Sequence, residues 1–229
     1  MLKKKNCYRK YYLRSSKQWP IPTTQLWCLA PVGVRTVTMR KGKVYIALLH
    51  YPMYNKRMDI ITTSVTNLDL HDISRVARTY NVEGFFVVHP SPSQHRLIKE
   101  IVSYWQEGYG GSYNPDRKEA FDRLMTVDSL QEVLNIIQDK TGQKPDTIAT
   151  DARVYPNTVS YRDMKDKIFN NEQVFLILFG TGWGMDKSLI ASCTYILEPV
   201  QGDANYNHLS VRSAVSIIID RLLGEYWFI

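Results

Sequence analysis

The sequence lacks several features that would place it in a familiar class. Its 229 residues include only three cysteines, and none of them forms a CxxC pair. This argues against a disulfide framework and against a thiolate zinc site. No stretch approaches the roughly 18 apolar residues of a membrane-spanning helix, and no apolar segment with a cleavage site follows the charged N-terminus. We therefore expect a cytoplasmic protein with reduced cysteines and no membrane partner.

Acidic residues are absent from the first 38 positions, which hold eight of the 29 lysines and arginines. The rest of the chain has 21 basic against 22 acidic side chains, so the net charge of +7 says little about the folded body. Two interpretations stay open for the basic segment. It is either an arm that grips phosphates without sequence preference or an upstream extension outside the working protein, with Met39 as the natural start. We expect residues 1–42 to form this extension and residues 43–229 to form one domain.

From residue 43 onward, short apolar runs alternate with segments of helical period. The apolar runs predict strands at residues 44–50, 84–89, 125–127, 147–150, 174–179 and 195–197. The intervening segments predict helices at residues 69–80, 94–107, 115–124, 130–140, 161–170 and 209–223. Such alternation, with almost continuously apolar strands, is typical of an α/β fold in which helices cover both faces of a parallel sheet.

The strongest local motif is LILFGTGWGM at residues 176–185, where a buried strand runs into Gly180, Gly182 and Gly184. Glycines in this position let the backbone bend sharply and approach a ligand closely. A dinucleotide-binding turn has the spacing GxGxxG instead, and it follows the first strand of its unit. Here only 45 residues follow Gly184, too few to complete such a sheet. Elements that precede the motif must therefore close the site.

Two further loops lie near the C-terminus. Residues 197–202 (LEPVQG) leave a strand into a proline- and glycine-containing turn, and residues 205–214 (NYNHLSVRSA) lead into the final helix. Apolar residues recur on one face of that helix, which predicts packing against the core. Either Asn207 or Ser210 is expected to cap its N-terminus, where free N–H groups can meet a ligand.

These three loops, FGTGWG, EPVQG and YNHLSVRSA, resemble the motifs that form the knotted cofactor pocket of SPOUT methyltransferases. The strings HYPMYNKR, VTNLDLHDISRVARTY and GYGGSYNPDRKEA resemble a bacterial branch of that superfamily described as SAM-dependent RNA methyltransferases. The resemblance covers about residues 44–224. It implies a parallel sheet with a deep C-terminal trefoil knot, a homodimer, S-adenosylmethionine (SAM) as cofactor, and tRNA or rRNA as substrate. The RNA substrate rests on the resemblance alone.

SAM carries a sulfonium cation and no phosphate, which agrees with the lack of a Walker-type lysine. The resemblance implies that backbone groups of the three loops hold the adenosine, and a position like Thr150 touches the cofactor in related enzymes. The other residues to which it assigns the cofactor are Gly180, Thr181, Gly182, Trp183, Gly184, Glu198, Pro199, Gly202, Asn207, His208, Leu209 and Ser210. The chain departs from the SpoU branch at two positions: Gly182 stands near that branch's glutamate and Ser210 stands at its asparagine. Catalytic roles assigned through those two positions stay open.

Candidates for the chemistry lie in the segment NLDLHDISR at residues 67–75. Methyl transfer is an in-line displacement that needs a closely held nucleophile, and a base where the nucleophile carries a proton. The resemblance implies that Arg75 lies by the methyl-transfer centre, often contributed across the dimer. We expect Asn67 to position the substrate and Asp69 or Asp72 to act as base. Asn67 or Asp69 is also expected to cap the helix.

Several side chains are candidate substrate contacts. His71, Arg75 and Arg78 share one helical stripe, which is either a solvated charged face or a substrate-facing one. Residues 108–113 are expected to form a flexible aromatic loop, either a lid over the site with a stacking surface or an ordinary helix connection. Asn114 is expected to cap the next helix. The predicted substrate-binding residues are His71, Arg78, Tyr113, Arg117 and Arg212.

No metal is expected, because His50, His89 and His95 lack the spacing of metal ligands. Two other functions stay open. The glycine loop could bind another nucleotide such as NAD, although Glu198, the only acidic candidate for its ribose, is misplaced for the usual unit. Alternatively, the chain could be a non-catalytic RNA-binding protein that kept the fold and relies on its basic segment.

Overall fold

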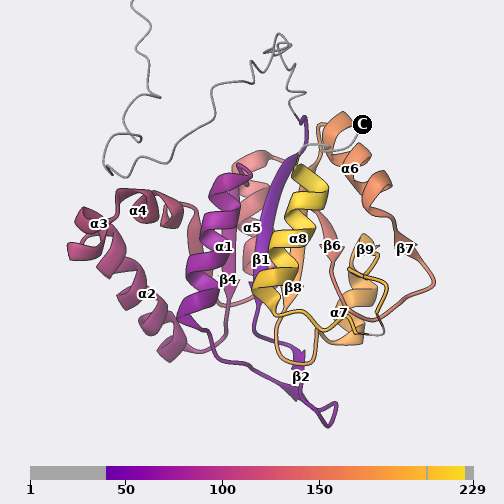
Figure 1. Cartoon of the computed structure of the whole chain (residues 1–229), viewed down its shortest axis with the longest axis horizontal. Coiled ribbons are helices and arrows are strands. Elements are labelled where there is room, and N and C mark those ends of the chain that lie inside the picture. The colour runs from indigo at the N-terminus through magenta and orange to yellow at the C-terminus, as the bar shows by residue number, and fades with distance from the viewer. Residues whose placement is uncertain (1–39, 205, 225–229) are drawn as a thin grey trace, which may run out of the picture. The chain divides into compact units, whose positions relative to one another are not determined.

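The computed structural model describes residues 40–204 and 206–224. Its body is a sheet of seven strands in the order β5-β4-β1-β8-β6-β9-β7, and every neighbouring pair is parallel (Figure 1). The strands are β1 (Lys43–Leu49), β4 (Gly84–Val88), β5 (Leu124–Val127), β6 (Asp146–Ala149), β7 (Thr158–Val159), β8 (Val174–Gly180) and β9 (Tyr195–Leu197). The predicted α/β fold with a parallel sheet is confirmed. The predicted basic extension falls almost wholly on residues outside the described ranges, as do Cys7 and Cys28, whereas Cys193 is a half-buried free thiol.

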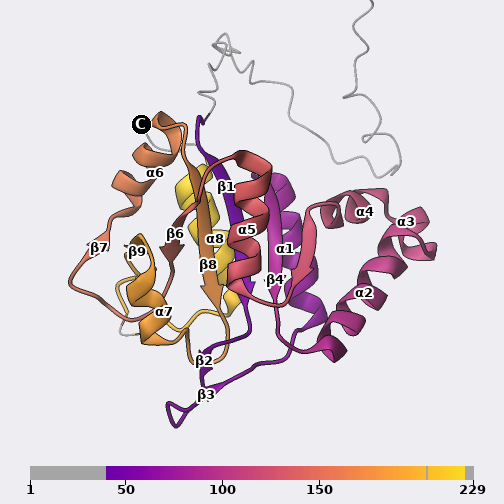
Figure 2. The same ribbon diagram turned by 180° about the vertical axis from the view of Figure 1, so that it is seen from behind.

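The central strand β1 shows how the sequence produces two layers of helices. Val44, Ile46 and Leu48 point to one face, while Tyr45, Ala47 and Leu49 point to the other. The first face is covered by α1 (Asn67–Thr79), α6 (Tyr161–Asn170) and α8 (Val211–Leu223), and the second by α5 (Leu130–Thr141) and α7 (Lys187–Ser192) (Figure 2). Each large apolar side chain buried this way contributes about 1.5–3 kcal/mol relative to exposure.

Beside α1, the helices α2 (Pro92–Gln106), α3 (Tyr109–Tyr113) and α4 (Pro115–Phe121) form one flank of the molecule (Figure 1). The flexible loop predicted at residues 108–113 is wrong, because most of it is the helix α3. A Cβ at Gly110 would lie 2.8 Å from Cε3 of Trp105, and both Gly110 and Gly111 are buried. These glycines therefore permit close packing against α2 rather than motion.

Three helix caps can be compared with prediction. The cap of α1 is Thr66, whose Oγ1 accepts a hydrogen bond from the Asp69 backbone at 3.2 Å, so neither Asn67 nor Asp69 is the cap. Asn114 caps α4 as expected, accepting from the Arg117 backbone at 3.1 Å. Ser210, not Asn207, caps α8.

A short antiparallel hairpin was absent from the sequence prediction. It consists of β2 (Met53–Tyr54) and β3 (Ile60–Ile61) and projects from the carboxyl edge of the sheet (Figure 1). Strands of two residues are too short to show an alternating pattern. Within residues 40–204 and 206–224, no helix combines the length and the apolar character needed to cross a bilayer.

Candidate active site

A cavity of about 930 Å³ opens at the carboxyl ends of β6 and β8. Its walls come from residues 150–153 after β6, residues 179–185 around the end of β8, and residues 206–211 before α8. Thr63, Ser64, Thr66 and Asp69 close it from the side of α1. Ligand sites in open α/β sheets lie at this edge, outside the carboxyl ends of the strands.

The glycine loop is bent in a way that only glycine adopts easily. Gly182 has φ +60° and Gly184 has φ +97°, both in the left-handed region. A Cβ on Gly184 would also lie 3.2 Å from Nη2 of Arg153. The Trp183 N–H donates to the Tyr54 carbonyl at 3.1 Å, which fixes the loop against the hairpin. At its glycines the loop therefore presents backbone to the cavity, and the side chains of Thr181, Trp183 and Met185 line it as well.

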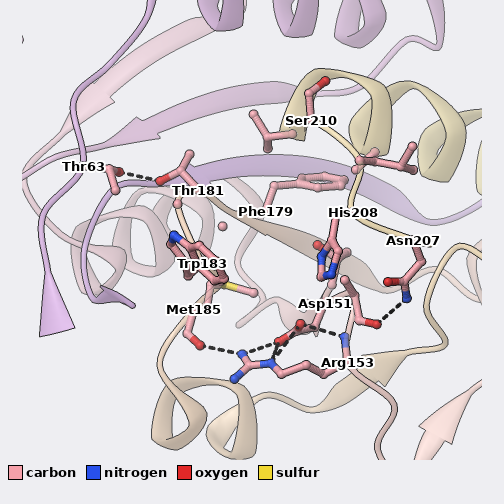
Figure 3. A pocket seen from close by; sticks show the side chains of 18 of the residues that line it. Thr63, Asp151, Arg153, Phe179, Thr181, Trp183, Met185, Asn207, His208 and Ser210 are labelled. Atoms are coloured by element: carbon pink, nitrogen blue, oxygen red, sulfur yellow. Dashed lines mark hydrogen bonds and ion pairs between the residues drawn. The ribbon is translucent and has the colours of Figure 1, made fainter. Parts of the chain in front are cut away.

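A half-buried ion pair supports the loop from below (Figure 3). Arg153 Nη2 lies 2.5 Å from Asp151 Oδ2 and donates to the Met185 carbonyl at 2.9 Å. Hydrogen bonding to Asp151 raises the pKa of Arg153, and burial raises the pKa of Tyr155, which donates to Asp151, to about 12. The Arg153 guanidinium is thus neutralised by Asp151 and occupied by its bonds. The pair acts as a support for the loop and leaves no free positive charge for a phosphate.

The third loop is joined to the loop after β6. Asn207 Nδ2 donates to the Ala152 carbonyl at 2.7 Å (Figure 3), and the rings of Tyr206 and His208 meet edge to face at 5.5 Å. Glu198 has a different task, because its Oε1 accepts from the Tyr161 backbone at 2.8 Å, at the start of α6.

Most of the predicted cofactor residues converge on this cavity. The structure brings together Thr150, Gly180, Thr181, Gly182, Trp183, Gly184, Asn207, His208, Leu209 and Ser210. Glu198, Pro199 and Gly202 are not among the lining residues. Sequence reasoning missed the apolar lining of Phe179, Met185, Val200 and Tyr206, although Phe179 and Met185 flank the glycine motif directly.

The comparisons with known proteins decide the family. A family described as SAM-dependent RNA methyltransferase matches residues 43–224. The chain belongs to this family. The predicted membership of a SAM-dependent RNA methyltransferase family is thereby confirmed, together with SAM as the cofactor and methyl transfer to RNA as the reaction.

Two relatives and one solved structure illustrate the match. The methyltransferase is 44% identical over 187 residues to an uncharacterized protein of Aquifex aeolicus, covering 82% of this chain and 91% of that protein. It is 38% identical over 192 residues to a tRNA (guanine-N(1)-)-methyltransferase of Oleidesulfovibrio alaskensis, covering 83% of this chain but 44% of that protein. The chain thus spans less than half the length of that relative. A probable methyltransferase of Bordetella pertussis shares the fold, with TM-score 0.53, 15% identity, and coverage of 80% and 95% of the two chains.

Three of the four predicted catalytic residues of the methyltransferase are divided between two places. Asp69 lines the cavity with a side chain only 9% exposed, and its Oδ1 lies 3.4 Å from Nε of Arg212. Nη1 of the same arginine lies 3.3 Å from Asp72 Oδ2. Asp72 and Arg75 line a second, open depression between α1 and α8. Asn67 is exposed and lines neither place.

Four predicted substrate residues lie where α1 meets the α2–α4 flank or on that flank, and none of them lines the cavity. His71 packs edge-on against Trp105 and Phe121, with ring centroids 5.2 and 4.8 Å apart, and burial lowers its pKa. The Arg117 guanidinium lies 4.5 Å above the Trp105 ring. The other two also contact residues of this flank: Arg78 pairs with Glu119, and Tyr113 stacks on Tyr109. The predicted stripe is therefore split, because α4 covers part of α1.

A buried polar network adjoins the cavity at the ends of β1 and β4. Thr63 Oγ1 lies 3.0 Å from Nδ1 of His50 and 2.5 Å from Oγ1 of Thr181, and the Thr63 carbonyl lies 3.0 Å from Nε2 of His89. Thr181 also donates to the Leu49 carbonyl at 3.1 Å. Burial, and then the neighbouring His89, lower the pKa of His50 to about 4. In the described ranges, no three His, Cys, Asp or Glu side chains gather as metal ligands.

Proposed function

We propose that this cavity is the SAM site and that the enzyme methylates a nucleotide of tRNA or rRNA there. The observation that carries the proposal is the position of Asp69, a buried carboxylate lining the same cavity as the glycine loop. A carboxylate so placed can accept a proton from a nucleophile that enters the cavity. SAM supplies the electrophilic methyl group.

The lining fits an adenosine cofactor without phosphates. The volume of about 930 Å³ suits a ligand of SAM's size. Phe179, Val200 and Leu209 offer apolar surface, and the glycine loop offers backbone groups. The lining cation Arg153 is neutralised by Asp151, and the N-terminus of α8 is capped by Ser210. NAD would bring a pyrophosphate for which these groups provide no free positive charge.

The roles of the surrounding side chains follow from what they contact. We propose Asp69 as the base, held by Arg212, in preference to Asp72, which lies in the outer depression. Arg75 is exposed in that depression, beside half-buried apolar residues of α1 and α8. This arrangement supports a homodimer in which a second copy packs over α1 and α8 and brings its own Arg75 to the site. Asn67, at the start of α1, would then meet substrate at the rim.

A C-terminal trefoil knot is part of the proposal. The segment after β9 lies beside the loop after β6, where Asn207 bonds to Ala152, and then enters α8 on the face shared with α1 and α6. A chain that passes the β6 loop and returns to the opposite layer is what a knotted cofactor pocket requires. Because tRNA and rRNA are cytoplasmic molecules, we also place the enzyme in the cytoplasm.

The test is calorimetric titration of the chain with SAM and, in parallel, with NAD, followed by methyl incorporation from tritiated SAM into bulk tRNA and rRNA. We expect micromolar binding of SAM alone and incorporation into one RNA class, tRNA being tried first because of the tRNA methyltransferase relatives. A dimeric, folded protein that binds no SAM would sink the proposal. SAM binding without turnover on any RNA would favour the non-catalytic alternative.

A further inference from the structure

The end of the HYPMYNKR segment at residues 50–57 has no task in the function described so far. It forms the first half of the β2–β3 hairpin, which stands out from the carboxyl edge of the sheet in both views (Figures 1 and 2). This is the edge at which the cavity opens. The hairpin therefore lies where a large substrate would approach.

The base of the hairpin is bonded to the glycine loop. The Tyr54 N–H donates to the Gly184 carbonyl at 2.9 Å, and the Trp183 N–H returns a bond to the Tyr54 carbonyl at 3.1 Å. The Asp186 N–H donates to the Pro52 carbonyl at 3.1 Å, and the Tyr54 hydroxyl donates to Asp186 Oδ1 at 2.6 Å. The hairpin and the cofactor loop therefore form one hydrogen-bonded unit, and the position of the tip is fixed relative to the cavity.

The tip is organised by Asn55 so that two cations face solvent. Asn55 Oδ1 accepts from the backbones of Arg57 at 2.7 Å and Asp59 at 3.0 Å, and its Nδ2 donates to Asp59 Oδ2 at 3.0 Å. Lys56 and Arg57 are both exposed. Neither side chain has a hydrogen bond or an ion pair with any residue in the described part of the chain. The nearby carboxylate is occupied by Asn55, so the two cations are available to an anionic ligand.

Met58, the third residue of the tip, connects the hairpin with the cavity. Met58 has φ +66°, is 50% exposed, and lines the cavity. This left-handed backbone, which costs about 1–2 kcal/mol at a residue other than glycine, holds the methionine at the cavity. Trp183, 59% exposed, lines the same cavity. Exposed apolar and aromatic side chains at such a mouth suit a nucleobase, whose faces stack on aromatic rings.

We propose that the β2–β3 hairpin is an RNA-binding element. Lys56 and Arg57 bind backbone phosphates beside the target nucleotide, while Met58 and Trp183 contact its base at the cavity mouth. Phosphate contacts of this kind fix the register of the nucleic acid, and contacts to an unstacked base suit a nucleotide splayed out of its strand. This inference rests on the proposed function, namely that the substrate is RNA. It explains how a body with 21 basic and 22 acidic side chains can hold a polyanion, because two adjacent exposed cations stand at one fixed place.

The test compares two double variants of the full chain that each lose two positive charges. Lys56→Gln/Arg57→Gln changes the tip, and Lys41→Gln/Lys144→Gln changes exposed lysines just before β1 and β6, at the opposite edge of the sheet. Binding of labelled bulk tRNA and of labelled rRNA is measured by anisotropy over a salt series. The tip variant is expected to bind about tenfold more weakly, with a salt slope smaller by about 1.4, the value for two contacts on single strands. The affinity for SAM stays unchanged.

A third variant tests the role of the methionine. Met58→Asn keeps a residue that tolerates left-handed backbone, so its melting temperature stays the same while its KM for RNA rises several-fold. If wild-type protein neither binds nor methylates any RNA, the proposed function fails and this inference falls with it. If wild type methylates RNA but the tip variant and Met58→Asn match the control, the hairpin proposal alone is overturned.

Discussion

The carboxyl edge of the sheet differs between its two halves: the ends of β1 and β4 are filled by side chains, and the ends of β8 and β6 leave a cavity. His50 follows β1 and His89 follows β4, and both are buried. Together with the half-buried Thr63 they fill the space at these strand ends. Around the ends of β8 and β6 stand Gly180 and Thr150, and a cavity remains. All four strands bring a buried apolar residue to this edge, namely Leu49, Val88, Phe179 and Ala149. The contrast therefore lies in the residue that ends or follows each strand. A site arises where small residues leave volume that larger side chains occupy elsewhere.

The filled half of this edge, at the ends of β1 and β4, supports the open half, at the ends of β8 and β6. Thr181, in the glycine loop, shares its hydroxyl with Thr63 and donates it to the Leu49 carbonyl. Each such hydrogen bond contributes about 0.5–1.5 kcal/mol. The histidine network therefore holds the loop from one side while the Asp151–Arg153 pair holds it from the other. The predictions below separate chemistry in the open half from support in the filled half.

The largest effect is expected from removing the carboxylate that faces the cavity. Asp69→Asn should lower kcat by about 10²–10⁴-fold, the usual contribution of a general base, and leave the Kd of SAM nearly unchanged. Asp72→Asn is the matched control, because Arg212 contacts both carboxylates but Asp72 lines only the outer depression. Equal losses in the two variants would show that the ion pairs with Arg212, and not a base, are what matters.

The second effect concerns the filled half and pH. His50 has a folded-state pKa of about 4, below the ordinary 6.5, so folding favours its neutral form. The contribution to stability is complete above about pH 6.5 and is lost as the pH falls toward 4, amounting to about 3 kcal/mol. Urea unfolding between pH 7 and pH 4 should show this loss in wild type and a flatter profile in His50→Gln. Parallel profiles for the two proteins would contradict it.

A smaller effect is expected in the glycine loop. Gly182→Val would force a left-handed backbone, at φ +60°, and place its Cβ 3.2 Å from the Tyr54 carbonyl oxygen. Strain of about 1–3 kcal/mol should weaken SAM binding roughly tenfold by calorimetry. Gly142→Val is the control: Gly142 has φ +74° at the end of α5, with nothing within 4 Å of a Cβ, so that variant loses stability but keeps its affinity for SAM.

The sequence predicted those features whose causes are local. Long apolar runs predicted the central strands, and the glycine spacing predicted the sharply bent loop after β8, because strand burial and left-handed turns are encoded within a few residues. It missed the hairpin, whose strands have two residues each, and the apolar lining such as Val200. It also did not show that α4 packs against His71 and Arg78. Which neighbour covers a helix face depends on residues some 40 positions away, and one sequence does not show that.

Arg75 and Arg78, three positions apart on α1, offer the finest test of this last point. Arg78 is half-exposed and pairs with Glu119 on α4, and such surface pairs contribute about 0–1 kcal/mol. Arg78→Gln should therefore change stability by less than that and leave kcat/KM for RNA essentially unaltered. Arg75→Gln, in the depression between α1 and α8, should lower kcat if a second copy brings this residue to the site. If Arg78→Gln lost activity and Arg75→Gln did not, substrate would approach over the α2–α4 flank, and the proposed dimer arrangement would have to be abandoned.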